Sequence, residues 1–192
     1  MRIYLDHNAT TPLRDEVREA MQAALGAGFG NPSSGHAEGA AARRLLETAR
    51  EQVAACLSVH PDAVVFGTGA TEANNSVLLA PLLAGGERRH VVTTAVEHPS
   101  VLAPAALLES RGWRVTRIPV DAEGRVDPAQ LVRAIDAETA LVCVIWANNE
   151  TGVIQPVEEI AAGVRERGVP LHLDATQALG KWPVDLSRLP VD

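Results

Sequence analysis

A carboxylate at the end of an apolar run is the residue of this chain best placed to do chemistry. The run begins near Val169 and ends at Asp174, and small and polar residues follow as far as Gly180. If the run is a parallel strand, Asp174 lies at the carboxyl end of a sheet, where ligands bind in α/β proteins. A half-buried carboxylate there needs a cationic or hydrogen-bonding partner to stay ionised. The protonated ring nitrogen of pyridoxal phosphate is one such partner, and a simple helix-capping Asp is the alternative.

The segment Gly67–Glu72 has the composition of a phosphate-binding loop. Its glycines allow a tight turn, and a helix that begins there offers N–H groups and a positive dipole end to an anion, with Thr71 adding a hydroxyl. It is neither a dinucleotide fingerprint, because Glu72 occupies the third glycine position, nor a P-loop, which requires Gly-Lys. An ordinary turn between a strand and a Thr-capped helix fits it as well.

Two further polar segments follow predicted strands. His98 could stack on an aromatic cofactor or transfer a proton near neutral pH, although a solvent-facing loop histidine has the same surroundings. Asn148 and Asn149 could donate to a cofactor oxygen or a substrate carboxylate, or could simply form a turn. All four segments fall at one edge of one predicted sheet. That convergence favours a cofactor site over four independent turns.

The elements that must hold these residues alternate along the chain. The apolar periodicity predicts helices at 14–25, 37–57, 71–83, 99–111, 128–135 and 156–167. It predicts strands at 3–5, 63–66, 90–95, 113–118, 141–146 and 169–173. This order indicates an α/β fold, a mostly parallel sheet with helices on both faces.

Composition excludes several classes of protein. The 192 residues carry a net charge of −7 without a stripe of Lys and Arg, which disfavours nucleic-acid binding. The apolar stretches are too short to span a membrane, and the N-terminus lacks the order of a signal peptide. Cys56 and Cys143 have no metal-ligand spacing, so we expect no metal and two buried, reduced thiols in a cytoplasmic protein. Lys181 is the only lysine among 17 basic residues.

Six motifs in this order resemble the cysteine desulfurases, pyridoxal-phosphate enzymes of the class V aminotransferase group. They are Tyr4–Pro12, Gly30–Ser34, Gly69–Glu72, Glu97-His98, Asn148–Gly152 and Asp174–Gln177. The likeness runs from residue 2 to residue 192 and implies the large domain of the PLP-dependent transferase fold type I. It also implies that residues 1–15 form an N-terminal arm of the small domain and that residues 16–192 belong to the PLP-binding large domain.

The resemblance further implies a role for the residues around the cofactor. Ala70 and Thr71 would bind its phosphate, and His98 would stack on the pyridine ring and help to move protons. The family reaction takes sulfur from L-cysteine, leaves L-alanine and holds the sulfur as an enzyme-bound persulfide for iron–sulfur cluster or thio-cofactor biosynthesis.

Three more side chains would contact the cofactor ring or the substrate in an enzyme of this kind. Asp174 would pair with the ring nitrogen, and Gln177 would hydrogen-bond the phenolic oxygen. Asn149 would lie near that oxygen and the substrate carboxylate. The expected partners are L-cysteine and a sulfur-acceptor or scaffold protein, and the complete enzyme is expected to be a homodimer that binds no nucleic acid and no membrane.

The chain also departs from the family pattern. The resemblance places the Schiff-base lysine, in a Ser-x-His-Lys motif, beyond residue 192, and the persulfide-forming cysteine and a substrate-binding arginine further on. Neither Cys56 nor Cys143 matches the catalytic cysteine's motif. We therefore expect the N-terminal portion of a desulfurase, incomplete at its C-terminus and inactive alone. The alternatives are a selenocysteine lyase or other class V lyase, and a non-catalytic fragment that binds phosphate ligands or a partner.

Overall fold

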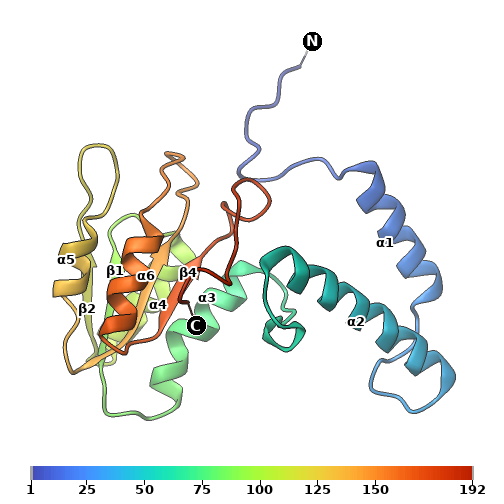
Figure 1. Ribbon diagram of the computed structural model, residues 1–192, viewed down its shortest axis with the longest axis horizontal. Helices are drawn as coiled ribbons and strands as arrows, with labels where there is room; N and C mark the ends of the chain where they lie inside the picture. The colour runs from blue at the N-terminus through green and yellow to red at the C-terminus, as the bar shows by residue number, and fades with distance from the viewer. Residues whose placement is uncertain (1, 192) are drawn as a thin grey trace. The chain divides into compact units, whose positions relative to one another are not determined.

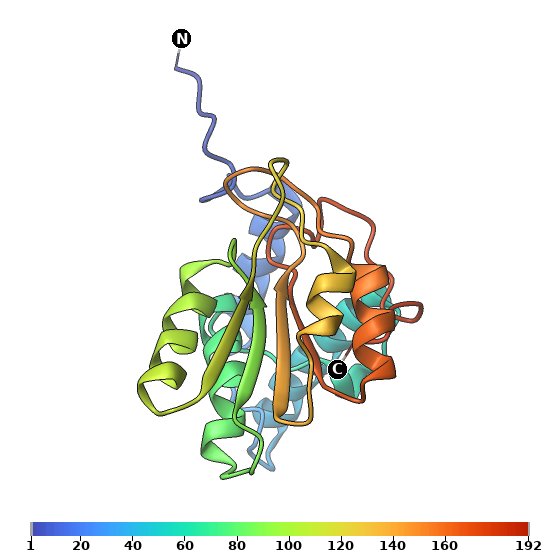
Figure 2. The same cartoon turned by 90° about the vertical axis from the view of Figure 1, so that its left-hand side faces the viewer.

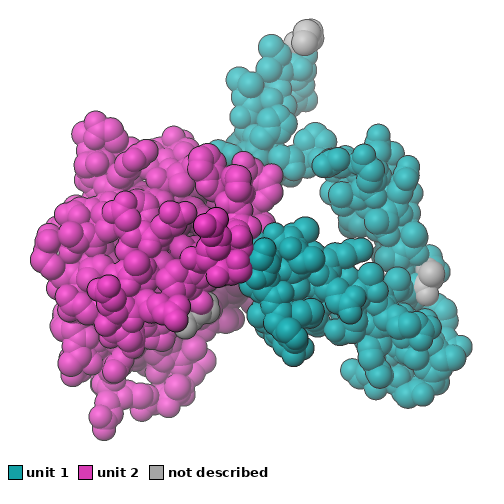
Figure 3. Space-filling view, in the orientation of Figure 1, with its two compact units in different colours: residues 1–65 teal, residues 66–192 magenta. Residues whose placement is uncertain are grey.

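The computed structural model describes residues 2–191. The chain divides into two compact units, Met1–Val65 and Phe66–Asp192, coloured separately in Figure 3. No helix among the described residues is long and apolar enough to cross a membrane.

The first unit consists of two helices and a short turn. They are α1 (Asp15–Ala27), α2 (Ala37–Leu57) and the 3-10 turn η1 (Pro61–Ala63) (Figure 1). Helix α2 begins after His36, whose ring nitrogen accepts from the N–H of Gly39, and it ends at Ser58 in the left-handed conformation. The predicted bounds of this helix are confirmed.

Two predicted strands in this unit are wrong. Residues 3–5 have no regular secondary structure, and residues 61–63 form the turn η1 where a strand was expected at 63–66. Pro61 starts that turn, and the ring of His60 accepts from the N–H of Asp62. A β-rich composition forms a strand only where a neighbouring strand accepts its hydrogen bonds, and the described part of the first unit contains none.

The expectation for the cysteines is half correct. Cys143 is buried, but Cys56 is exposed on α2. On α2, Leu45 is 47% exposed while the smaller Ala42 and Ala54 are buried.

The second unit contains a four-stranded parallel sheet in the order β2-β1-β3-β4. Its strands are β1 (His90–Thr94), β2 (Arg114–Ile118), β3 (Thr139–Ile145) and β4 (Leu171–Asp174). Its helices are α3 (Ala70–Leu83), α4 (Pro99–Ser110), α5 (Pro128–Arg133) and α6 (Val157–Glu166). Each of these eight elements was predicted, with ends that differ by at most a few residues.

Alternate residues of the central strands fill two cores on opposite faces of the sheet. Val91 and Cys143 pack with α3 and α4, while Val92 and Val144 pack with α5 and α6. Figure 2 shows the two pairs of helices on either side of the strands. The predicted α/β class, a parallel sheet covered on both faces, is therefore confirmed.

A buried histidine ties three strands together at the amino end of the sheet. The Nδ1 atom of His90 lies 2.8 Å from Oγ1 of Thr139 on β3, and its Nε2 atom lies 2.9 Å from Oγ1 of Thr116 on β2. The His90 side chain is fully buried. This end of the sheet is therefore closed by polar contacts, and the predicted site residues lie at the opposite end.

Candidate functional site at the carboxyl edge of the sheet

Asp174 is the last residue of β4 and is only 5% exposed. Its Oδ1 accepts from the N–H of Thr176 at 3.1 Å and from the hydroxyl of Thr176 at 2.6 Å, and its Oδ2 accepts from Nδ2 of Asn74 at 2.8 Å. Burial alone would raise the pKa of Asp174, but these hydrogen bonds and the nearby His172 outweigh it and lower the pKa. A turn, not an α-helix, follows Asp174, so the helix-capping alternative does not hold.

Asn74 on α3 is the centre of a buried hydrogen-bond network. Besides Asp174, its Nδ2 donates to Oγ of Ser100 at 2.9 Å, and its Oδ1 accepts from Nε2 of His172 at 2.7 Å. Asn74 is 2% exposed. Asn74 was not among the predicted site residues. The available signal was a pair of Asn residues inside a predicted helix, where Asn is unfavourable without a specific partner.

His98 is the N-cap of α4 and is half-buried. Its Nδ1 accepts from the backbone N–H of Ser100 at 3.1 Å and lies 2.8 Å from Oγ of Ser100. Because Nδ1 accepts from a backbone N–H, the hydrogen-bond network assigns the proton of the neutral ring to Nε2. The ring is therefore held in one tautomer by the start of its own helix.

Glu97, next to His98, is a buried carboxyl group. It belongs to one of the six motifs but was not a predicted site residue. Its Oε1 accepts from Oγ1 of Thr94 at 2.7 Å and from the N–H of Ile145 at 2.9 Å. Its Oε2 has no hydrogen-bond partner among the described residues. Burial raises the pKa of Glu97 to about 7 against the lowering effect of those two hydrogen bonds, and the charge of Asp174 adds to the rise.

The start of α3 lies at the segment predicted to bind phosphate. Gly69 is its N-cap at a φ of 153°, and no side chain caps the helix there. Glu72 instead closes the preceding loop, because its Oε2 accepts from the N–H of Thr68 at 2.5 Å and from the Thr68 hydroxyl at 2.7 Å. Ala70 and Thr71 thus begin a helix whose first N–H groups have no side-chain cap, although the Glu72 carboxylate lies in the same first turn. The strand expected before this loop is absent, as described above.

Asn148 and Asn149 have different surroundings. Asn148 is buried, and its side-chain oxygen accepts from the N–H groups of Glu150 and Thr151, both at 2.9 Å, so it forms the turn. Its Nδ2 also donates to the carbonyl of Val96 at 2.9 Å, which joins the loops after β3 and β1. Asn149 is half-exposed, and its Nδ2 donates to Oε1 of Glu150.

Gln177 follows Asp174 by three positions and is half-buried. Its side-chain oxygen accepts from the ammonium of Lys181, which is exposed. Gln177 therefore belongs to the turn after β4, on the same edge of the sheet as Asp174. Its predicted bond to a cofactor oxygen stays a prediction, as do the predicted roles of Thr71 and Asn149.

Hydrogen bonds connect these junctions to one another. Asn74 bridges α3 to both β4 and α4, and Nδ2 of Asn75 reaches the carbonyls of Thr71 at 2.7 Å and Ser100 at 3.3 Å. The structure thus joins Asp174 to His98 through the side chains of Asn74 and Ser100. The sequence did not reveal these two residues as partners.

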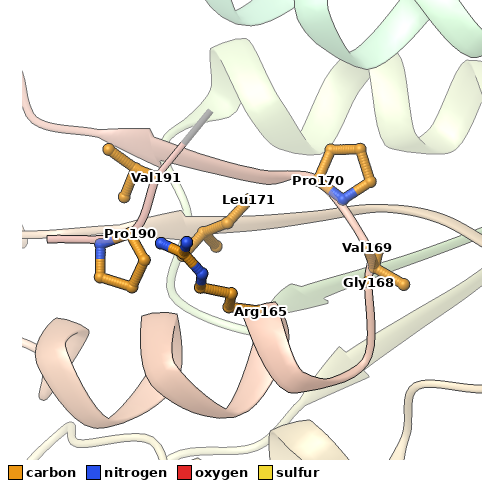
Figure 4. Close-up of a pocket in the computed structure, with 7 residues that line it drawn as sticks. All are labelled: Arg165, Gly168, Val169, Pro170, Leu171, Pro190 and Val191. Atoms are coloured by element: carbon orange, nitrogen blue, oxygen red, sulfur yellow. The ribbon is translucent and has the colours of Figure 1, made fainter.

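One hollow next to β4 lies away from the predicted site. A pocket of about 430 Å³ is found at the amino end of this strand, lined by Arg165, Gly168, Val169, Pro170, Leu171, Pro190 and Val191 (Figure 4). Because Leu171 begins β4 and Asp174 ends it, the pocket is at the other end of the strand. It contains no residue of the predicted site.

Comparison with known proteins matches this chain to one family. The family model described as Aminotransferase class-V covers residues 3–192. A cysteine desulfurase of Trichormus azollae is 45% identical over 190 residues, which are 99% of this chain and 48% of that protein. The chain spans about half the length of the curated relatives it matches.

Solved structures have the same fold. A NifS-like protein superposes with a TM-score of 0.95 at 38% identity, over 100% of this chain and 53% of the other. A lysine-to-alanine mutant of C-DES, with glycine covalently linked to the PLP cofactor, superposes with a TM-score of 0.82 at 25% identity, over 98% of this chain and 50% of the other.

Proposed function

The chain belongs to the class V aminotransferase family, and from that premise we propose that it supplies the N-terminal portion of a pyridoxal-phosphate-dependent cysteine desulfurase. The proposed reaction removes sulfur from L-cysteine, leaves L-alanine and holds the sulfur as an enzyme-bound persulfide. The similarity to desulfurases along almost the whole chain supports this reaction.

One observation in the structure carries the proposal. Asp174 is a buried carboxylate at the carboxyl end of β4 that three donors keep ionised. Each carboxylate oxygen has two lone-pair sites, so these three bonds leave room for one more donor. A buried negative charge with remaining acceptor capacity suits a protonated ring nitrogen.

The other residues of the edge fit the rest of this cofactor. Ala70 and Thr71, at a helix start without a side-chain cap, would hold a phosphate by their N–H groups and the Thr71 hydroxyl. His98 would lie against the ring, while Gln177 and Asn149 would contact its phenolic oxygen. When bound, pyridoxal phosphate supplies the electron sink on which amino-acid chemistry of this type depends.

The chain's own residues would then control charge and protons. Asp174 would keep the ring nitrogen protonated by holding a negative charge against it. His98 would present the proton on its Nε2, because Nδ1 accepts from the start of α4. Glu97 is buried at the same edge, and its pKa of about 7 would let it take up or release a proton near neutral pH.

Several features of the complete protein belong to the same proposal. We expect residues 1–15 to form an arm of the small domain, the complete enzyme to be a cytoplasmic homodimer, and the sulfur to pass to an acceptor or scaffold protein. Iron–sulfur cluster or thio-cofactor biosynthesis would use that sulfur. We also propose that the chain by itself has no desulfurase activity.

A comparison of two substrates tests the proposed reaction. The full-length protein that contains this chain, loaded with pyridoxal phosphate, should convert L-cysteine to equal amounts of L-alanine and transferable sulfur. L-selenocysteine is supplied in parallel, since a selenocysteine lyase would act on it and leave L-cysteine unchanged. If L-cysteine yields no alanine although the cofactor is bound, the proposed function is wrong, and alanine from L-selenocysteine alone would show a selenocysteine lyase instead.

A further inference from the structure

We propose that Asn74 is a positioning residue whose single side-chain amide fixes the carboxylate of Asp174 and, through Ser100, the ring of His98. The two groups at the edge of the sheet that are expected to face the cofactor would thus be set together by one residue of α3. The inference rests on the proposed function for its cofactor readout, and its structural basis lies within this chain.

The negative charge of the Asp174 carboxylate determines which atom donates and which accepts in the hydrogen bonds of Asn74. The carboxylate of Asp174 can only accept, so the atom of Asn74 that lies 2.8 Å away must be its NH₂ group. The second hydrogen of that group points to Oγ of Ser100 at 2.9 Å. The amide oxygen is then left to accept from Nε2 of His172 at 2.7 Å. Asn74 therefore has all its polar hydrogens and its oxygen in use.

The orientation continues to His98. Because Oγ of Ser100 accepts from Asn74, its single hydrogen is available for Nδ1 of His98, which lies 2.8 Å away. The backbone N–H of Ser100 donates to the same nitrogen. The backbone contact requires Nδ1 to be without a proton, so the Ser100 hydroxyl must be the donor in the other contact. A flipped Asn74 amide would place its oxygen against the carboxylate and reverse this order.

The network is dry, so its bonds are hard to replace. Asn74 is 2% exposed, Ser100 7% and Asp174 5%. In such surroundings a carboxylate that loses one donor keeps its desolvation cost and takes up a proton more readily. The other titratable groups near Asp174 are His172, Glu97 and Cys143. Of these, His172 also contacts Asn74 directly.

Two variants separate the two arms of the network. Asn74→Leu keeps a similar volume and removes every hydrogen bond of the amide. Ser100→Ala removes only the hydroxyl between Asn74 and His98 and leaves the bond from Asn74 to Asp174. Ser76→Ala, a change at an exposed position of the same helix, is the matched control.

The experiment uses the full-length protein and two readouts. In the cofactor-free protein, the ¹⁵N shift of the unprotonated Nδ1 of His98 reports the hydrogen bond from Oγ of Ser100, while the backbone N–H of Ser100 keeps the same tautomer in every variant. In the loaded protein, the pH dependence of the visible absorbance of the bound cofactor reports the charge of Asp174. Turnover of L-cysteine is measured alongside.

We expect Asn74→Leu to alter both readouts and to lower turnover about ten- to hundredfold, the range that loss of a charge-assisted hydrogen bond implies. Ser100→Ala should alter the His98 signals and leave the absorbance titration close to that of the wild type. Ser76→Ala should alter neither. The thermal unfolding midpoint of each variant shows whether it is folded.

Wild-type His98 signals and a wild-type absorbance titration in a folded Asn74→Leu protein would overturn the inference. If that variant does not fold, Ser100→Ala decides, since unchanged His98 signals in it would exclude the coupling. Failure of the proposed function is seen separately, as a wild-type protein that binds no pyridoxal phosphate. The ¹⁵N measurement needs no cofactor and would still test the coupling.

Discussion

Two buried carboxyl groups at the carboxyl edge of the sheet, after the strands on either side of β3, have opposite pKa shifts. Asp174 has three donors shared between its two oxygens, which lowers its pKa despite burial. Glu97 has two donors on one oxygen and none among the described residues on the other, so burial prevails and its pKa rises to about 7. A carboxyl group with a lowered pKa and one with a raised pKa thus lie at one edge, an arrangement typical of acid–base sites.

Removing the charge of Asp174 tests its role directly. In the full-length protein Asp174→Ala should lower the turnover of L-cysteine by on the order of 10² to 10³, a usual cost for losing electrostatic stabilisation at a reacting centre. The measurement is alanine formation under saturating cofactor, with the bound cofactor quantified. Glu123→Ala, at an exposed carboxylate, is the control. Near-normal turnover with cofactor still bound would remove Asp174 from this role.

The raised pKa of Glu97 predicts a pH-dependent stability. The folded protein binds the Glu97 proton more tightly than the unfolded chain, so the stabilisation is complete below pH 4.5 and is lost as pH rises to about 7. That difference corresponds to about 3 kcal/mol of unfolding free energy. Glu97→Gln keeps an acceptor for Thr94 and Ile145 and does not titrate. Urea unfolding at pH 5 and pH 8 should therefore show a smaller loss in the variant than in the wild type, and equal losses would contradict the prediction.

At the scale of elements, polar side chains determine how the ends of the strands are held. His90 contacts β2 and β3 at the amino end of the sheet. At the carboxyl end, Glu97 in the loop after β1 accepts from Ile145 of β3, and Asn148 in the turn after β3 donates to the loop after β1. The central strands carry mostly apolar residues to both faces, with Thr93 as a buried polar exception. Backbone hydrogen bonds pair the strands, and the buried polar contacts add links at both ends, each of which a single substitution removes.

Acid should weaken the contact at the amino end. Burial, together with the charge of Arg114, lowers the pKa of His90 although Asp136 acts in the opposite direction. The folded protein thus prefers neutral His90, and the contribution of that preference is present above pH 6.5 and declines as pH falls below it. His90→Asn should lose about 1–3 kcal/mol of unfolding free energy at pH 7.5 and less at pH 5. A cost that does not shrink at pH 5 would contradict this sign.

The start of α3 is an element end that a larger side chain should disturb. Gly69 has a φ of 153°, which favours glycine, and open space lies around its Cα. Gly69→Val should strain the backbone by about 1–3 kcal/mol and weaken pyridoxal phosphate binding roughly tenfold or more. Cofactor titration of the full-length protein measures this, with Gly86→Val, at an exposed glycine without a positive φ, as the control. Unchanged affinity in the Gly69 variant would mean that the phosphate binds elsewhere.

At the scale of the whole molecule, the described residues form one four-stranded sheet, and the chain spans about half the length of the curated relatives it matches. Its only lysine, Lys181, is exposed and bonded to Gln177 in the turn after β4. A lysine that carries a cofactor needs a supported, buried or charge-tuned position. Lys181 is exposed, so burial does not supply such a position.

Chemical trapping tests this interpretation of Lys181. Borohydride reduction of the 192-residue chain with pyridoxal phosphate, followed by peptide mapping, should give no stoichiometric label on Lys181, and the chain should release no sulfide from cysteine. The full-length protein treated in the same way is the positive control. Stoichiometric labelling of Lys181 together with sulfide release would show that this chain is an enzyme by itself.

The sequence by itself determined the order and type of the elements around the site. Apolar periodicity and the positions of Pro and Gly are local signals, and they predicted α2 at its observed bounds and every strand and helix of the second unit. The carboxyl edge followed from the same pattern, because parallel strands that alternate with helices must end together. Asp174 and His98 were found for that reason.

Only the tertiary structure decided which side chains hold that edge together. Asn74 meets Ser100 and Asp174 across 26 and 100 positions of the chain, and Glu97 meets Ile145 across 48, distances over which local periodicity carries no information. The strands expected at 3–5 and 63–66 failed for a related reason, since a strand exists only with a partner to share its hydrogen bonds. The structure also shows that Cys143 is buried and Cys56 is exposed. The sequence could not predict this difference, because exposure depends on what packs over a residue and not on its neighbours in sequence.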